Sequence, residues 1–145
     1  MKNKVSEDNF GSSKTSVNTG SLAISCAVVP VAGKGRGVIA MRDFEAGETL
    51  EQAPAIVVPA RDIENICQTV LDDFWYEWGE NGACAVAGGC GSFYNHSFDP
   101  NADFLTDISA HKIVYLALKP IRAGEEVTIN YNGPGYFEPV GFEVH

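Results

Sequence analysis

Three short segments of the chain hold residue types that could bind a ligand or take part in a reaction. The first is the run Gly33-Lys34-Gly35-Arg36-Gly37, in which glycines would let a ligand approach the backbone closely and would permit positive φ angles. The run lacks the Gly-Lys-Ser/Thr of a phosphate-binding loop and the spacing of a dinucleotide-binding motif. On its own it predicts only a structural turn.

The second segment runs from Gly91 to Ala102 and places Asn95 beside His96. An amide next to an imidazole offers paired donors and acceptors that could read the edge of a heterocycle. The alternative is a turn rich in Asn and Pro, with a histidine that is satisfied in the core. For an isolated histidine this alternative is the better interpretation.

The third segment is Ile121–Tyr131, and its sequence is typical of a turn followed by a strand that ends in a tyrosine. A phenol at a strand end could face a site. The alternative is a plain hairpin with an aromatic residue at its edge.

Together and in this order, the three segments resemble the SET domain family of protein-lysine methyltransferases. The family's GxG turn corresponds to Gly35-Arg36-Gly37, its NHSxxPN signature to residues 95–101, and its GEE-containing strand to residues 123–131. The resemblance covers about Ile24 to Phe137. It is greatest for the minimal SET proteins of large viruses and bacteria, which lack flanking domains.

The resemblance implies S-adenosylmethionine as the cofactor and the ε-amine of a protein lysine as the methyl acceptor. It implies that the cofactor is bound by residues of all three segments: Lys34, Gly35, Arg36, Gly37, Asn95, His96 and Tyr131. It also implies that Tyr131 lies where methyl donor and acceptor meet, with Tyr76 and Tyr136 as the other catalytic tyrosines of the lysine channel.

One position departs from the pattern of many eukaryotic members. They have a cysteine where this chain has Phe98, and that cysteine often binds zinc together with a cysteine-rich C-terminal segment. Residues 133–145 contain no cysteine. We therefore expect no metal, and we expect Tyr136 or Phe137 to close the substrate channel instead.

The elements that must position these residues are mostly short strands. Apolar alternation and frequent Gly and Pro predict strands and turns from residue 22 onward. Only Arg61 to Phe74 has apolar residues at helical spacing. The expected fold is mostly β with one or two short helices, and the resemblance implies a SET domain (a β-clip) whose C-terminal strand is tucked in as a pseudoknot.

Length and charge limit the function classes. The 145 residues fit one domain, which we place at residues 22–145, after a flexible polar tail at residues 1–21. The tail has three lysines and two acidic residues, so the total charge of −9 leaves −10 on the domain. Such a charge opposes nucleic-acid binding and suits a basic lysine-containing partner, such as a histone-like or ribosomal protein. The acidity peaks between residues 61 and 80, where a solvated acidic face is the simpler interpretation.

Further expectations concern compartment and alternatives. No run of eighteen apolar residues exists and residues 1–20 lack the apolar core of a signal peptide, so we predict an intracellular protein, cytoplasmic or nuclear (host nuclear for a viral enzyme) if its substrate is a histone. A homodimer is possible.

One alternative function is a catalytically inactive SET-fold module that binds a basic peptide, although such a module has no chemical need to keep Asn95, His96 and Tyr131. Another is a thiol or metal protein built on Cys84, Cys90 and His96, which the spacing disfavours.

Overall fold

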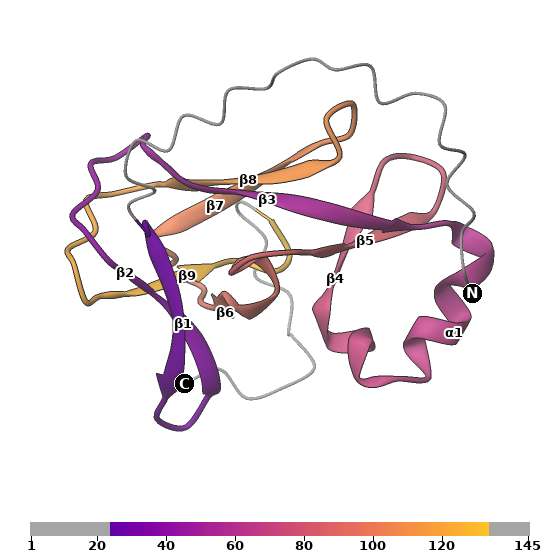
Figure 1. Cartoon of the computed structure of the whole chain (residues 1–145), viewed down its shortest axis with the longest axis horizontal. Helices are drawn as coiled ribbons and strands as arrows, with labels where there is room; N and C mark the ends of the chain where they lie inside the picture. The colour runs from indigo at the N-terminus through magenta and orange to yellow at the C-terminus, as the bar shows by residue number, and fades with distance from the viewer. Residues whose placement is uncertain (1–23, 134–145) are drawn as a thin grey trace, which may run out of the picture.

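The computed structural model describes residues 24–133 of the chain, and strands dominate that range. The chain forms two sheets there (Figure 1). The four-stranded sheet has the order β1 (Cys26–Val31), β2 (Gly35–Ala40), β9 (Glu126–Ile129) and β6 (Asn95–His96). The five-stranded sheet has the order β4 (Trp75–Trp78), β5 (Ala83–Ala87), β3 (Thr49–Val58), β8 (Lys112–Ala117) and β7 (Ala102–Asp107). The prediction of a mostly β fold is confirmed.

The helical segment is shorter than its apolar spacing suggests. A single α-helix, α1, spans Ile63–Cys67, and 3-10 turns cover Ala60–Asp62, Val70–Phe74 and Gly91–Phe93. Thr69 ends α1 because its backbone is extended and its hydroxyl donates to the carbonyl of Ile66 (2.8 Å) while accepting from the amide of Leu71 (3.1 Å). Val70 is 79% exposed, so the helical spacing does not mark one continuous buried face. None of the described helices is long and apolar enough to cross a membrane.

Strand β9 is inserted between strands that precede it by many residues. It pairs antiparallel with β2, through Val38 and Val127, and parallel with β6, where Asn95 lies opposite Thr128. The side chain of Asn101 adds two further bonds, donating to the carbonyl of Glu126 (2.8 Å) and accepting from the amide of Thr128 (2.9 Å). This insertion (Figure 1) agrees with the expected tuck of the C-terminal strand.

The long strand β3 changes partners along its length. Its first half pairs with β8 as far as Pro54, and its second half pairs with β5 from Ala55 onward. Pro54 interrupts the sequence pattern and predicts two separate strands, but the chain continues as one because the proline, which has no N–H to donate, lies where the pairing changes. The register with β8 also shifts between Thr49 and Glu51.

The core lies between the two sheets and contains mainly aliphatic and aromatic side chains. Its largest fully buried members are Tyr94, Tyr115, Phe44, Ile113, Ile121, Ile129, Val38 and Val127. Residues from β2, β9, β8 and the segment before β6 thus share one core, which fixes the mutual positions of the elements that carry the three chemically promising segments.

Candidate functional site

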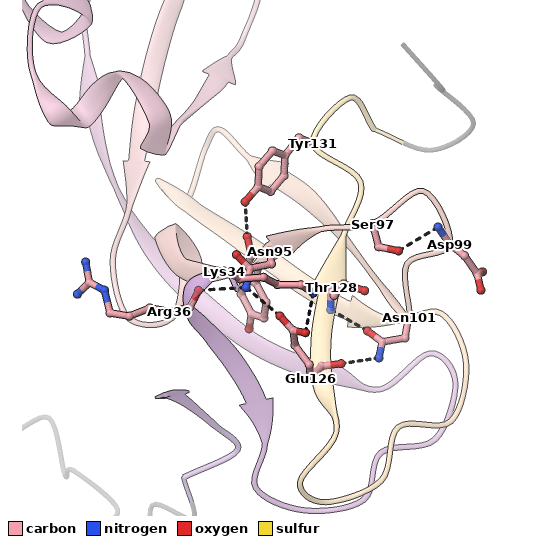
Figure 2. Close-up of polar contacts among 10 residues, drawn as sticks. Lys34, Arg36, Asn95, Ser97, Asp99, Asn101, Glu126, Thr128 and Tyr131 are labelled. Carbon is pink, nitrogen blue, oxygen red and sulfur yellow. Dashed lines mark hydrogen bonds and ion pairs between the residues drawn. The ribbon is translucent and has the colours of Figure 1, made fainter. Parts of the chain in front are cut away.

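The side chain of Asn95 joins the three segments. Its Nδ2 atom donates to the carbonyl of Arg36 (3.0 Å) and to the Oε1 atom of Glu126 (2.8 Å) (Figure 2). Arg36 lies in the glycine-rich turn and Glu126 begins β9. Residues separated by 31 to 59 positions in the sequence therefore meet around one amide group.

The glycines of the turn have two different roles. Gly33 and Gly35 have φ angles of +76° and +77° with open space beside them, so they are needed for the conformation of the turn. Gly37 is needed because of its neighbours. A Cβ atom there would lie 2.6 Å from Nδ2 of Asn95, 2.8 Å from Cγ2 of Val31 and 2.9 Å from Oε1 of Glu126. The close approach that was expected for a ligand is, at Gly37, an approach by Asn95.

The two cations of the turn lie in different electrostatic surroundings. Lys34 forms an ion pair of 2.8 Å with Oε2 of Glu126, and both side chains are mostly buried. The guanidinium of Arg36 lies over the ring of Phe93, 4.4 Å from its centroid, and forms no ion pair within residues 24–133. Arg36 is therefore the cation of this turn that is available to an anionic ligand.

His96 is a buried residue that holds the backbone of Tyr131. The amide of Tyr131 donates to its Nδ1 atom (3.1 Å), which requires a lone pair on Nδ1 and places the proton of the neutral ring on Nε2. Burial lowers the pKa of His96 below its ordinary value. The ring also meets Phe98 and Tyr131 edge to face, at centroid distances of 4.5 and 5.2 Å. The geometry makes His96 a neutral anchor at physiological pH.

The hydroxyl of Tyr131 donates to the carbonyl of Tyr94 (2.7 Å), and this bond is the dashed line that leaves Tyr131 in Figure 2. Burial raises the pKa of Tyr131 to about 12, and the carboxylates of Asp73 and Glu126 add to this shift. The phenol therefore stays protonated at neutral pH, with its proton directed to Tyr94. Tyr131 is 39% exposed, so a ligand can reach its side chain.

Tyr76 comes from β4 and lies in a polar cluster under the same site. Its hydroxyl donates to the carbonyl of Gly91 (2.6 Å) and accepts from the hydroxyl of Tyr115 (3.0 Å). Its ring meets Phe104 edge to face at 5.0 Å. Burial raises the pKa of Tyr76, and Tyr131 is close enough to contribute to that shift. The structure thus brings Tyr76 and Tyr131 together, but the protein itself already holds the hydroxyl of Tyr76. The expected roles of Tyr136 and Phe137 fall outside the described residues.

Two residues of the site received no role from the sequence. Glu126 connects Lys34 with Asn95, and Asn101 fixes the backbone of β9. Both stand inside the motifs that carry the family resemblance. Glu126 could have been found from the sequence, because it is a charged residue in a strand that ends at a tyrosine of the site.

The metal-binding alternative finds no ligand set in residues 24–133, where no three His, Cys, Asp or Glu side chains gather in a way that could hold a metal ion. Cys84 is fully buried, Cys90 is partly exposed and His96 is engaged with Tyr131. All four cysteines of the chain lie in the described range and are free thiols.

Two solved structures with the same fold illustrate the likeness. A Plasmodium falciparum chain described as a candidate histone methyltransferase has 23% identity and a TM-score of 0.62, over 79% of this chain and 97% of that one. A chain of a humanized mutant of the Chaetomium thermophilum Polycomb Repressive Complex 2, bound to an inhibitor, has 22% identity and a TM-score of 0.60; the match covers 76% of this chain and 15% of that one. At these identities the likeness shows a shared fold. Comparison of the sequence with curated proteins gives no match.

The family model described as the SET domain matches residues 35–132. This range begins at the first glycine of the GxG turn and ends one residue after Tyr131, so it includes Asn95, Glu126 and the strand order that brings them together. Because the match spans well over half of the chain and the fold agrees with it, this chain belongs to the SET domain family.

Proposed function

We propose that this protein transfers the methyl group of S-adenosylmethionine to the ε-amine of a lysine in a basic protein. The observation that carries the proposal is the hydroxyl of Tyr131, which is held by the carbonyl of Tyr94 directly beside the Asn95-His96 pair. Membership of the SET domain family and the methyltransferase neighbours support methyl transfer in general. The cofactor and the acceptor are our inference from the chemistry of the site.

The residues around Asn95 fit the amino-acid end of such a cofactor. That end carries a carboxylate and an ammonium group. Arg36 supplies an exposed cation without an ion pair among the described residues. The side-chain oxygen Oδ1 of Asn95 accepts no hydrogen bond there, and both bonds of this side chain are made by Nδ2. The open space beside Gly35 leaves room for a ligand along the turn. When bound, the cofactor would supply an electrophilic methyl group on a sulfonium.

In the proposed reaction Tyr131 orients the acceptor amine. Methyl transfer is an in-line displacement, so the nitrogen, the methyl carbon and the sulfur must be aligned, and positioning alone can lower such a barrier by several kcal/mol. The Tyr131 proton is committed to Tyr94, so its oxygen can accept a hydrogen bond from the amine. This contact would direct the lone pair of the nitrogen.

Tyr131 does not act as the base. A lysine with a pKa of about 10.4 must lose a proton before it can attack, but a phenol with a pKa of about 12 is neutral and does not take that proton at physiological pH. The proton therefore leaves to solvent before transfer. Desolvation of the amine and a positive sulfonium nearby would lower the lysine pKa and favour the neutral form.

The substrate side of the proposal rests on charge and aromatic residues. The acidic domain suits a histone-like or ribosomal protein, since opposite charge favours encounter. We assign Tyr76 and Tyr136 to the lysine channel together with Tyr131; the contacts of the Tyr76 hydroxyl with Gly91 and Tyr115 support the part of Tyr76 in it. An enzyme with these substrates would act inside a cell, in the cytoplasm or a nucleus, as a monomer or a homodimer.

The test is methyl transfer from labelled S-adenosylmethionine to basic proteins, followed by mass spectrometry of the products. We expect lysine methylation by the wild type and a loss of transfer of at least about tenfold in Tyr131→Phe. Calorimetry should show that the variant still binds the cofactor, because the hydroxyl acts on the acceptor. Absence of both transfer and cofactor binding in the wild type would refute the proposal. Binding of a basic peptide without any transfer would favour the alternative of an inactive SET-fold module.

A further inference from the structure

Glu51 is a carboxylate that faces the interior of the protein from β3. The register between β3 and β8 shifts at Thr49 and Glu51, so that Glu51 lies opposite Tyr115. Residues opposite one another on antiparallel strands share a face of the sheet, and Tyr115 is fully buried. The irregularity therefore turns a charged side chain inward. Bulges that re-aim a side chain are common next to active sites.

Both oxygens of Glu51 hold the segment that leads into Asn95. Oε1 accepts from the amide of Cys90 (2.9 Å) and Oε2 accepts from the hydroxyl of Tyr94 (3.2 Å). The chain passes so close that a Cβ atom on Gly89, which has a φ of +57°, would collide with Oε1 of Glu51. The carboxylate of Glu51 therefore binds this segment at both ends, at Cys90 and at Tyr94.

No cation within residues 24–133 forms an ion pair with Glu51; the pairs found there involve other carboxylates. Glu51 is half-buried, so its carboxylate is partly removed from water and relies on these two hydrogen bonds to offset the cost. Burial raises the pKa of Cys26 and of Cys90 to about 11, and the charge of Glu51 adds to both shifts. An apolar residue at this position could accept neither of these two hydrogen bonds, which points to a role of Glu51 in holding the segment from Cys90 to Tyr94.

The role of Glu51 follows from the groups that the segment from Cys90 to Tyr94 positions. The carbonyl of Tyr94 receives the hydroxyl of Tyr131 (2.7 Å), and Asn95 and His96 come immediately afterwards. We infer that Glu51 is a positioning residue of the methyl-transfer site, which acts through the hydroxyl of Tyr94 to hold the Tyr94 carbonyl against Tyr131. The inference rests on the proposed function and adds to it a residue that lies on the far side of Tyr94 from Tyr131.

Packing of the Tyr94 ring links the position of its hydroxyl to the position of its carbonyl. It packs against the ring of Tyr115 at a centroid distance of 4.4 Å, with the two planes tilted by 32°. The hydroxyl of Tyr115 in turn donates to the hydroxyl of Tyr76 and to the carbonyl of Gly91. With its ring packed and its hydroxyl bonded to Glu51, Tyr94 has little freedom to rotate. Its carbonyl, and with it the oxygen of Tyr131, is fixed in direction.

The experiment compares Glu51→Ala, Tyr94→Phe and the double variant with the wild type. Tyr94→Phe removes the hydroxyl that donates to Glu51 and keeps the carbonyl that Tyr131 uses. We expect each single variant to lower kcat about tenfold, because displacement near the reacting atoms can cost that much or more. The cofactor Kd and the peptide KM should change less than about threefold. The double variant should be no slower than the worse single one, since both remove the same contact. Glu77→Gln, an exposed carboxylate on β4, is the matched control and should retain wild-type rates.

The possible outcomes separate the two proposals. An active wild type with unchanged kcat in folded Glu51→Ala and Tyr94→Phe overturns the inference and leaves the proposed function intact. Additive losses in the double variant overturn the route through Tyr94. A wild type that transfers no methyl group overturns both. If Glu51→Ala does not fold, Tyr94→Phe decides by itself, because it deletes one oxygen from a packed ring.

Discussion

Replacing Gly37 by alanine should damage the site without altering any side chain that contacts a ligand. The added Cβ atom would lie 2.6 Å from Nδ2 of Asn95, whereas ordinary contacts begin at 3.4 Å. Relief of this overlap needs a shift of the amide by about 0.8 Å. Its bonds to Arg36 and Glu126, now 3.0 and 2.8 Å long, would then exceed hydrogen-bond distance.

The energetic consequence can be bounded. Two hydrogen bonds of this kind contribute about 0.5 to 1.5 kcal/mol each, and overpacking in a close-packed interior typically costs about 1 to 3 kcal/mol. We therefore expect the free energy of unfolding of Gly37→Ala to fall by about 2 to 6 kcal/mol. If Asn95 binds the cofactor as proposed, a loss of about 1.4 kcal/mol there weakens the cofactor Kd tenfold.

Gly33→Ala is the matched control in the same turn. Its φ of +76° makes alanine strained, but nothing lies within 4 Å of the new Cβ atom. It should lose about 1 to 2 kcal/mol of stability and keep the wild-type cofactor affinity. Urea denaturation and calorimetry with S-adenosylmethionine measure both quantities. If Gly37→Ala binds the cofactor as tightly as Gly33→Ala does, the reasoning about Asn95 is wrong.

Two further variants test the polar contacts of the site. Glu126→Gln leaves the mostly buried Lys34 without its carboxylate and should lower the free energy of unfolding by about 2 kcal/mol, whereas the exposed neighbour Glu125→Gln should change it little. Burial lowers the pKa of His96, so the folded protein favours the neutral ring. That contribution to stability is present above pH 6.5, the value of the unfolded residue, and disappears as the pH falls through the lower folded pKa. Urea denaturation at pH 7.5 and 5.5 should therefore show a larger loss of unfolding free energy on acidification in the wild type than in His96→Asn; equal losses would exclude His96 as the source of the pH dependence.

The sequence allowed the convergence of the site to be predicted better than its internal contacts. Order and residue types in three segments indicated that the glycine-rich turn, Asn95-His96 and Tyr131 belong together, and the structure brings them together. Their roles toward cofactor and substrate stay predictions. The residues that hold them in place, such as Glu126, are separated from their partners by up to 92 positions, a spacing that no local pattern encodes.

The secondary structure departs from the predictions where tertiary contacts outweigh local signals. Thr69 ends the helix that apolar spacing would continue, because its hydroxyl competes for the backbone. Pro54 does not divide β3, since the strand changes partners there. The inward turn of Glu51 depends on a register shift against β8, and register follows from packing across the sheet. Each departure involves a partner strand or turn that the local sequence does not identify.

The fixed carboxylates around the site have opposite effects on the two stages of the proposed reaction. Asp73 and Glu126 raise the pKa of Tyr131, and Glu51 adds to that of Tyr76, so a negative field reaches both phenols. Such a field attracts a cationic lysine, but it also stabilises the ammonium form that cannot attack. Burial is the largest cause of every one of these tyrosine shifts. A lysine beside Tyr131 would meet the same desolvation, which acts on an ammonium in the opposite direction and favours the neutral amine. In the proposed reaction the acidic residues therefore attract the lysine substrate. Burial of the amine, together with the sulfonium of the cofactor, must lower the lysine pKa so that the neutral amine can attack.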